Sequence, residues 1–127
     1  MKTAAVLLLV AAANAAVTFE NFPATGVACP NSDASADLTS DTASLQAAAE
    51  AARNDEPYEQ SAANLASGQC SKLSLPYLIT TAEQANGEPA GSLSFAWDEA
   101  TETIYYCGVQ GLYSTNGSGY PDSCEQL

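Results

Sequence analysis

The most regular hydrophobic pattern in this chain lies at residues 92–97, where leucine, phenylalanine and tryptophan alternate with small residues. Strict alternation is typical of a β-strand with one buried face. A second β-prone run, 102–109, follows a polar turn at 98–101. The two runs predict an antiparallel hairpin. Six of the ten aromatic residues lie between residues 95 and 120, so we expect the hydrophobic core to centre on this sheet.

Weaker signals flank the hairpin. Residues 72–81 alternate loosely, and Pro76 makes them an edge strand or a bulged strand, because proline cannot donate to a hydrogen-bonded ladder. Residues 82–91 contain Asn86-Gly87 and a further proline, which predicts a loop. Residues 111–120 are rich in Gly, Ser and Asn and are predicted to form another loop.

The pattern changes to a helical one upstream. Asp41 is a predicted N-cap for a helix over 42–53, where Ala, Leu, Gln and Glu have high helix propensity. One face of this helix holds only apolar residues, namely Leu45, Ala48, Ala49 and Ala52. Pro57 favours the start of a shorter second helix through 58–65, and Gly68 is a suitable C-terminal cap for it.

This order of elements predicts an α+β domain at residues 41–127, with an N-terminal helix, or two, packed on a small antiparallel β-sheet. Residues 16–40 are rich in Ala, Ser, Thr, Asp and Pro, and are predicted to be an extended arm docked through Phe19 and Phe22. A mature chain of about 110 residues is one domain's worth and buries a modest core.

Residues 1–15 have the pattern of a secretory signal peptide, with Lys2, a short apolar run and the small-residue site Ala13-Asn14-Ala15. The run is too short to span a bilayer. Cleavage after Ala15 or Ala16 predicts a secreted, extracellular protein. The alternative interpretation is a buried N-terminal helix.

The charge balance excludes two classes of partner. The chain has three basic and fifteen acidic side chains, a net charge of −12, and loss of Lys2 with the leader makes it −13. Nucleic-acid binding needs a footprint of Lys and Arg that is missing here. An anionic membrane surface repels such a protein for the same reason.

Four cysteines remain in the mature chain, and an even number in a small exported protein predicts two disulfides. Three pairings are possible. We favour Cys29–Cys124, which ties the two ends together, with Cys70–Cys107 nested inside it, because closing the long loop removes the most unfolded-state entropy. A metal site is the weaker alternative, since the chain has no histidine and no CxxC spacing.

The absence of histidine also rules out Ser-His-Asp and Cys-His catalysis. Carboxylates remain, in the turn group Asp98, Glu99 and Glu102 and in the preceding loop at Glu83 and Glu88. A glycosidase needs two such groups across a cleft, with Trp97, Tyr105 or Tyr106 as stacking platforms. The competing interpretation is that these acids face water in turns and that the aromatic residues belong to the core.

Two further patterns are open to two interpretations. Asp33, Asp37 and Asp41 recur every four residues, but lack the spacing of an EF-hand and are better explained as a solvated acidic loop. Asn116-Gly117-Ser118 is an N-glycosylation sequon, and the same residues also suit a plain turn.

In its leader, size, acidity and even cysteine count, the chain resembles the small secreted, cysteine-bridged effector-like proteins of filamentous fungi or oomycetes. It is also similar to the fungal guanyl-specific ribonuclease scaffold. In that resemblance residues 42–53 stand for the helix, the strands around Phe95 and Tyr105 for the sheet, and Gly117 to Cys124 for the closing segment. The family's catalytic glutamate, arginine and histidine have no counterpart here, so the resemblance implies the scaffold without the activity.

We therefore expect a secreted, monomeric, non-enzymatic protein with no cofactor or metal, involved in virulence. It would bind a host or extracellular protein, or a wall component, through a surface that includes Trp97, Asp98, Glu99 and Tyr113. Aromatic residues on a rigid sheet give a large contact area at low entropic cost. The alternatives are a small carboxylate-dependent hydrolase and a passive wall or matrix component.

Overall fold

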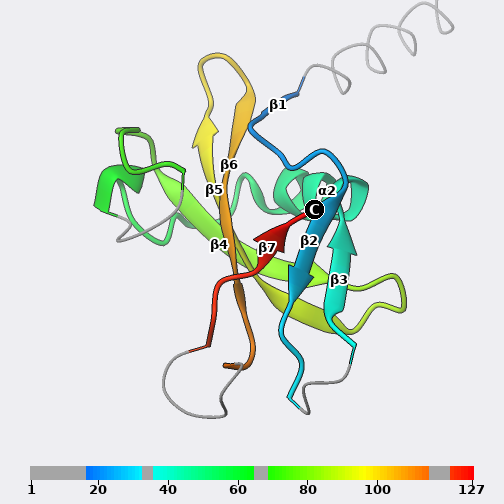
Figure 1. Cartoon of the computed structure of the whole chain (residues 1–127). Helices are drawn as coiled ribbons and strands as arrows, with labels where there is room; N and C mark the ends of the chain where they lie inside the picture. Colours follow the sequence, from blue (N-terminus) through cyan, green and yellow to red (C-terminus); the bar gives the residue numbers. More distant parts are fainter. Residues whose placement is uncertain (1–16, 33–35, 65–68, 115–120) are drawn as a thin grey trace, which may run out of the picture.

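The computed structural model describes residues 17–32, 36–64, 69–114 and 121–127, which form two β-sheets and one α-helix, α2 (Thr42–Ala52) (Figure 1). Sheet A has the order β1-β6-β5-β4, with bounds Thr18–Glu20, Thr103–Gly111, Pro89–Asp98 and Tyr77–Glu83. Sheet B has the order β3-β2-β7, with bounds Leu38–Asp41, Gly26–Cys29 and Glu125–Gln126. No helix in these residues is long and apolar enough to cross a membrane.

The predicted hairpin is confirmed as β5 and β6, which pair in antiparallel fashion. A β-bulge interrupts their register: Phe95 pairs with Tyr106, whereas its neighbour Ser94 pairs with Gly108, so Cys107 is an extra residue in β6. Alternate residues of a strand point to the same face. The extra residue therefore lets Tyr106 and Val109, three positions apart, both enter the same core.

The other β predictions are correct in position but not in extent. β4 begins at Tyr77, directly after Pro76, and continues into the predicted loop. The connection to β5 is only the turn 84–88, where the Asn86 side chain accepts a hydrogen bond from the Glu88 amide (2.9 Å). Gly87 supplies the positive φ (87°) that this turn requires.

Helix α2 lies where its sequence predicts. The Asp41 carboxylate accepts a hydrogen bond from the Ser44 amide (2.7 Å), as an N-cap does, and Leu45, Ala49 and Ala52 are buried. The second predicted helix is reduced to a 3-10 turn, Ala62–Asn64. The last part of that prediction, Leu65 to Gly68, lies outside the described residues.

The α+β expectation, an N-terminal helix packed on a small sheet, is wrong, because the described chain is mostly β. The predicted arm contains three strands, β1, β2 and β3. Each is three or four residues long without apolar alternation, and β1 and β2 pair with β6 and β7 from the other end of the chain. Local patterns do not reveal such distant pairing. The arm does dock through aromatic rings, and the ring centroids of Phe22 and Tyr106 lie 5.4 Å apart.

Two hydrophobic clusters lie on the two faces of sheet A. The larger one fills the space between its inner face and the layer made by α2 and sheet B, and its largest buried side chains are Tyr106, Phe95, Leu45, Leu93, Ile104 and Val27. The smaller one lies on the outer face, under the segment that joins α2 to β4, and comprises Ala62, Cys70, Tyr77, Ala96 and Cys107.

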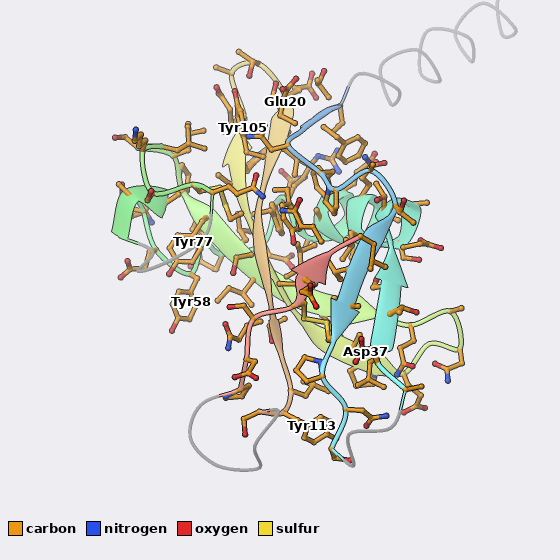
Figure 2. The ribbon with its side chains drawn as sticks, in the orientation of Figure 1. Glu20, Asp37, Tyr58, Tyr77, Tyr105 and Tyr113 are labelled. Carbon is orange, nitrogen blue, oxygen red and sulfur yellow. A yellow bond between two sulfur atoms is a disulfide. The ribbon has the colours of Figure 1, made fainter. Side chains whose placement is uncertain are left out.

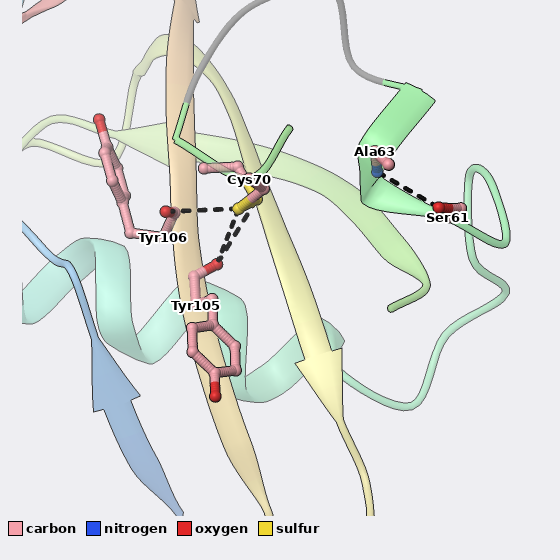
Figure 3. The surroundings of a disulfide bond; sticks show 6 residues. Ser61, Ala63, Cys70, Tyr105 and Tyr106 are labelled. Atoms are coloured by element: carbon pink, nitrogen blue, oxygen red, sulfur yellow. Dashed lines mark hydrogen bonds between the residues drawn. A yellow bond between two sulfur atoms is a disulfide. The ribbon is translucent and has the colours of Figure 1, made fainter. Parts of the chain in front are cut away.

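Two disulfides are present, Cys29–Cys124 and Cys70–Cys107, which is the pairing favoured from the sequence. The first joins β2 to the residue before β7. The second fastens the α2–β4 connection to the bulge in β6. Figure 3 shows Cys70 against the backbone of β6, where its sulfur lies 3.5 Å from the carbonyl oxygen of Tyr106. Because a disulfide sulfur carries no hydrogen, this is a close packing contact rather than a donated hydrogen bond.

The N-cap can be tested by replacing Asp41. Hydrogen bonds from the backbone and side chain of Ser44 lower the pKa of Asp41 below its ordinary value of 3.8, so the stabilisation is complete above that pH and is lost as the pH falls through the lowered value. We expect Asp41→Ala to lower the midpoint of urea unfolding at pH 7, Asp41→Asn to lower it less, and the advantage of wild type over Asp41→Asn to shrink at pH 3. Asp37→Ala, at another exposed aspartate, is the control, and an equal loss there would contradict the assignment.

The disulfides should differ in their contribution to stability. They close loops with sequence separations of 95 and 37 residues. In the chain-entropy model these loops correspond to about 4.7 and about 3.8 kcal/mol. We expect the Cys29→Ala/Cys124→Ala protein to be less stable than the Cys70→Ala/Cys107→Ala protein by roughly 1 kcal/mol in urea unfolding. The opposite order would show that local packing, not chain entropy, dominates.

Candidate functional site

The four residues predicted to form an interaction surface do not lie together. Trp97 and Asp98 end β5, and Glu99 begins the turn into β6, whereas Tyr113 follows the far end of β6. The nine residues of β6 between them correspond to about 30 Å at roughly 3.3 Å per residue. Figure 2 shows the same separation, with Tyr105, near the start of β6, and Tyr113 at opposite ends of the molecule.

Trp97 belongs to the core rather than to a ligand platform. Its side chain is 9% exposed, and the guanidinium carbon of Arg53 lies 5.7 Å from the ring centroid. This is a cation–π contact. Arg53 also donates a hydrogen bond to the Glu50 carbonyl oxygen (2.6 Å). The only arginine of the chain therefore holds the C-terminal end of α2 against sheet A.

The candidate catalytic acids form two groups at opposite ends of β5. Asp98 and Glu102 lie in the β5–β6 turn, where the Asp98 carboxylate accepts a hydrogen bond from the Ala100 amide (3.1 Å) and Glu102 has a positive φ (51°). Glu83 ends β4, and Glu88 lies in the β4–β5 turn. The ten residues of β5 separate the groups by about 30 Å, whereas a glycosidase places its two carboxyl groups roughly 5–9.5 Å apart.

The two tyrosines of β6 divide between the faces of sheet A. Tyr106 is 1% exposed in the inner core, and burial raises its pKa to about 12. Tyr105 is half-buried and packs against the smaller cluster on the outer face. Neither forms an open stacking platform.

The outer face of sheet A is covered at one end and open at the other. The strand register places two neighbouring rows of residues in the open part. One row is Ile79, Ser94 and Gly108, and the other is Thr81, Ser92 and Gln110. All six are exposed or half-exposed. These six residues form the open part of the outer face. It is a surface without charged side chains in a strongly acidic protein.

A hollow of about 290 Å³ adjoins the outer face. Its lining includes cysteines of both disulfides, Cys107 and Cys124, so its walls are covalently held. Its polar lining is neutral, provided by Gln69, Ser94, Gln110, Ser123 and Gln126. Gln110 is held in place by hydrogen bonds to the Pro121 carbonyl and from the Ser123 hydroxyl. Such groups bind neutral ligands by hydrogen bonds but offer no general base.

The most exposed aromatic side chain of the described residues lies beside the outer face. Tyr58 is 68% exposed and packs on Tyr77, with 5.6 Å between ring centroids (Figure 2). Ile79, two residues along β4 from Tyr77, is 43% exposed. Burial raises the pKa of Tyr77, and the charges of Glu59 and Tyr58 raise it further. We call Tyr58, Tyr77 and Ile79 the tyrosine–isoleucine patch.

Sequence reasoning missed this patch. It assigned Tyr58 to a helix and residues 72–81 to an edge strand or a bulged strand, and it singled out neither Tyr77 nor Ile79. The available signal was Pro76, which predicted an edge strand, because an edge strand presents unpaired main-chain groups at which a partner can add.

A second hollow, of about 440 Å³, lies between α2 and β4. We call it the α2–β4 groove, and its lining residues are Ala48, Ala51, Ala52, Asp55, Thr80, Thr81 and Glu83. It combines alanines on the helix with hydroxyl groups on the strand, and a carboxylate on each side. Asp98, Glu99 and Glu102 line neither hollow.

The remaining candidates receive no structural support. Asp37 and Asp41 belong to no group of three or more potential ligands in the described part of the chain, and Asp33 lies outside it. The sequon at Asn116, the segment from Gly117 to Tyr120, and the leader also lie outside the described residues. Glycosylation of Asn116 and cleavage of the leader stay predictions.

Comparison with protein-family models, with curated proteins and with solved structures finds no match to this chain. Neither the effector-like class nor the ribonuclease scaffold is identified by these comparisons. Inference about function therefore depends on the surfaces described above.

Proposed function

We propose that this protein is an exported binding protein, effector-like in its mode of action, that recognises a protein outside the cell that makes it. Recognition takes place through the exposed surface of sheet A. No catalytic residue is required. The leader and the even number of cysteines support export, and the two disulfides are of the kind that persist in oxidising compartments.

The observation that supports this proposal most strongly is the tyrosine–isoleucine patch. Tyrosine is enriched among residues that dominate protein–protein binding energy. Here Tyr58 is 68% exposed, yet its ring is supported by the buried Tyr77, and Tyr77 is fixed in a sheet that a disulfide reinforces. A rigid, exposed aromatic group loses little conformational entropy when a partner covers it.

The arrangement of acids supports the same conclusion over the hydrolase alternative. The two groups of carboxylates lie at opposite ends of β5, and the Asp98 carboxylate accepts a hydrogen bond within the β5–β6 turn. A passive wall component needs neither an exposed aromatic patch nor a structured hollow beside it.

The patch can be tested by the double substitution Tyr58→Ala/Ile79→Ser in protein purified from culture medium. We expect at least a tenfold loss of affinity for captured extracellular partner proteins, measured by biolayer interferometry against a panel of purified secreted and cell-surface proteins. Leu112→Ser/Tyr113→Ala, at the far end of sheet A, is the matched control. Equal losses in both variants, or loss of function in an Asp98→Ala/Glu99→Ala/Glu102→Ala protein that stays folded, would contradict the proposal.

A second candidate function is recognition of an uncharged wall polysaccharide in the neutral hollow. The glutamines and serines that line it are suited to sugar hydroxyl groups, and no charged side chain is among its lining residues. We expect a protein of this kind to co-sediment with insoluble β-glucan, chitin or cellulose, and Gln110→Ala to weaken that binding several-fold while Gln84→Ala, in the β4–β5 turn, does not. Absence of co-sedimentation with all three polymers would remove this candidate.

A further inference from the structure

We propose that the outer edge of β4 is a docking site at which an extended, basic segment of a partner protein adds to sheet A as a further strand, beside α2. This inference rests on the proposed binding function and specifies its partner and mode. Main-chain hydrogen bonds would provide affinity, and the α2–β4 groove and the tyrosine–isoleucine patch would read the side chains on either side.

The direction of the main-chain groups along β4 shows which residues are available. In antiparallel pairing, the N–H and C=O of one residue point to the same side, and the next residue points to the other. Tyr77 donates to the Glu59 carbonyl oxygen (3.0 Å) and accepts from the Tyr58 amide (2.8 Å), so it faces away from β5. Ile79 and Thr81 lie two and four residues further on, and their main-chain groups therefore face the same side.

The segment at Tyr58 and Glu59 shows that this edge accepts a strand. Glu59 and Tyr77 form an antiparallel bridge, which is the first step of an added strand. The Ala62 amide continues the contact toward the start of β4, where it donates to the Leu75 carbonyl oxygen (2.6 Å). In the described part of the chain no main-chain hydrogen bond continues it toward Ile79, and β4 is the last strand of sheet A. A ligand that continues the row would begin beside the exposed ring of Tyr58.

On the opposite side of the sheet, other segments of the chain cover the main-chain groups of β6. The side of β6 that faces away from β5 is covered in turn by β1, by Gln69, whose amide donates to the Cys107 carbonyl oxygen (2.9 Å), and by residues 122–124. Natural edge strands are usually protected by lysine, proline or a bulge. From Tyr77 to Ala82, β4 contains neither lysine nor proline, and its irregularity lies only at Ala82/Glu83.

The α2–β4 groove provides room for the side chains of an added strand. The helix contributes only alanines to this lining, Ala48, Ala51 and Ala52. Their short side chains leave the space between the helix and the edge of β4 open. The volume of about 440 Å³ is sufficient for several side chains. Side chains of the added strand on its other face would meet Ile79.

Charge favours a basic segment over a second copy of this chain. Asp55 and Glu83 lie on the two sides of the groove, and both carry negative charge. The whole chain has a net charge of −12, so a second copy docking edge to edge would bring like charges together. Lysine and arginine side chains on an extended segment have the complementary charge.

The test uses the full mature protein, labelled with ¹⁵N, and a seven-residue peptide with alternating lysine and valine. We expect shifts concentrated at the Ile79 and Thr81 amides, and deuterium exchange of these two amides slowed at least tenfold by the peptide. The Leu78 and Thr80 amides, which face β5, should be protected with or without it. A peptide with glutamate in place of lysine should not bind.

Two variants separate the backbone and charge contributions. Thr81→Pro removes one outward N–H, and Asp55→Lys/Glu83→Lys reverses the groove charges; each should weaken binding about tenfold or more. Two control variants should leave binding unchanged. Thr81→Val keeps the amide, and Glu99→Lys/Glu102→Lys makes the same change in net charge at the far turn. If Thr81→Pro does not fold, the charge pair and the exchange measurement decide.

Four outcomes would overturn the inference: no peptide binding, binding weakened equally by the charge reversal at the far turn, shifts away from β4, and a wild-type dimer held through β4. The inference can also fail while the proposed function holds. If Tyr58→Ala/Ile79→Ser abolishes partner binding while Thr81→Pro and the groove charge reversal leave it intact, the protein is a surface binder but the added strand is wrong.

Discussion

The side of β6 that faces away from β5 is the constraint on which the rest of the structure depends. Three separate segments bond to it, namely β1 near the N-terminus, Gln69 in the middle of the chain and residues 122–124 near the C-terminus. Each disulfide lies next to one of these attachments, because Cys70 follows Gln69 and Cys124 donates its amide to the Val109 carbonyl oxygen. Sheet B, through the segment that leads into β7, and the outer cluster, through Cys70, are thus both attached to one strand.

The parts of the fold that could be predicted from the sequence are those formed by neighbouring residues. The β5–β6 hairpin shows itself through alternation, and α2 through helix propensity and the Asp41 cap. The strands β1, β2 and β7 could not be predicted in this way. They are two to four residues long, and their stability comes from partners at the other end of the chain rather than from their own side chains. The fold class was misjudged for this reason.

The candidate site illustrates the same limit. Trp97 and Tyr113 are close to the same hairpin in sequence, but one is buried under Arg53 and the other lies at the far end of the sheet. Tyr58 and Ile79 are 21 positions apart, yet the Tyr58–Tyr77 contact brings them to one surface. Aromatic content identified the sheet that matters, but only the packing of the α2–β4 connection determines which rings remain exposed.

The position of Cys29 has a consequence for how the protein must be made. A chain is synthesised from its N-terminus, and the partner of Cys29 emerges only 95 residues later. Cys70 appears first, and its own partner is 37 residues further on. The earliest bridge open to the growing chain is therefore a non-native one between Cys29 and Cys70. Reaching the native pairs from that bridge requires thiol–disulfide exchange, so the yield of correctly bonded protein depends on reshuffling after synthesis and not on the supply of oxidant alone.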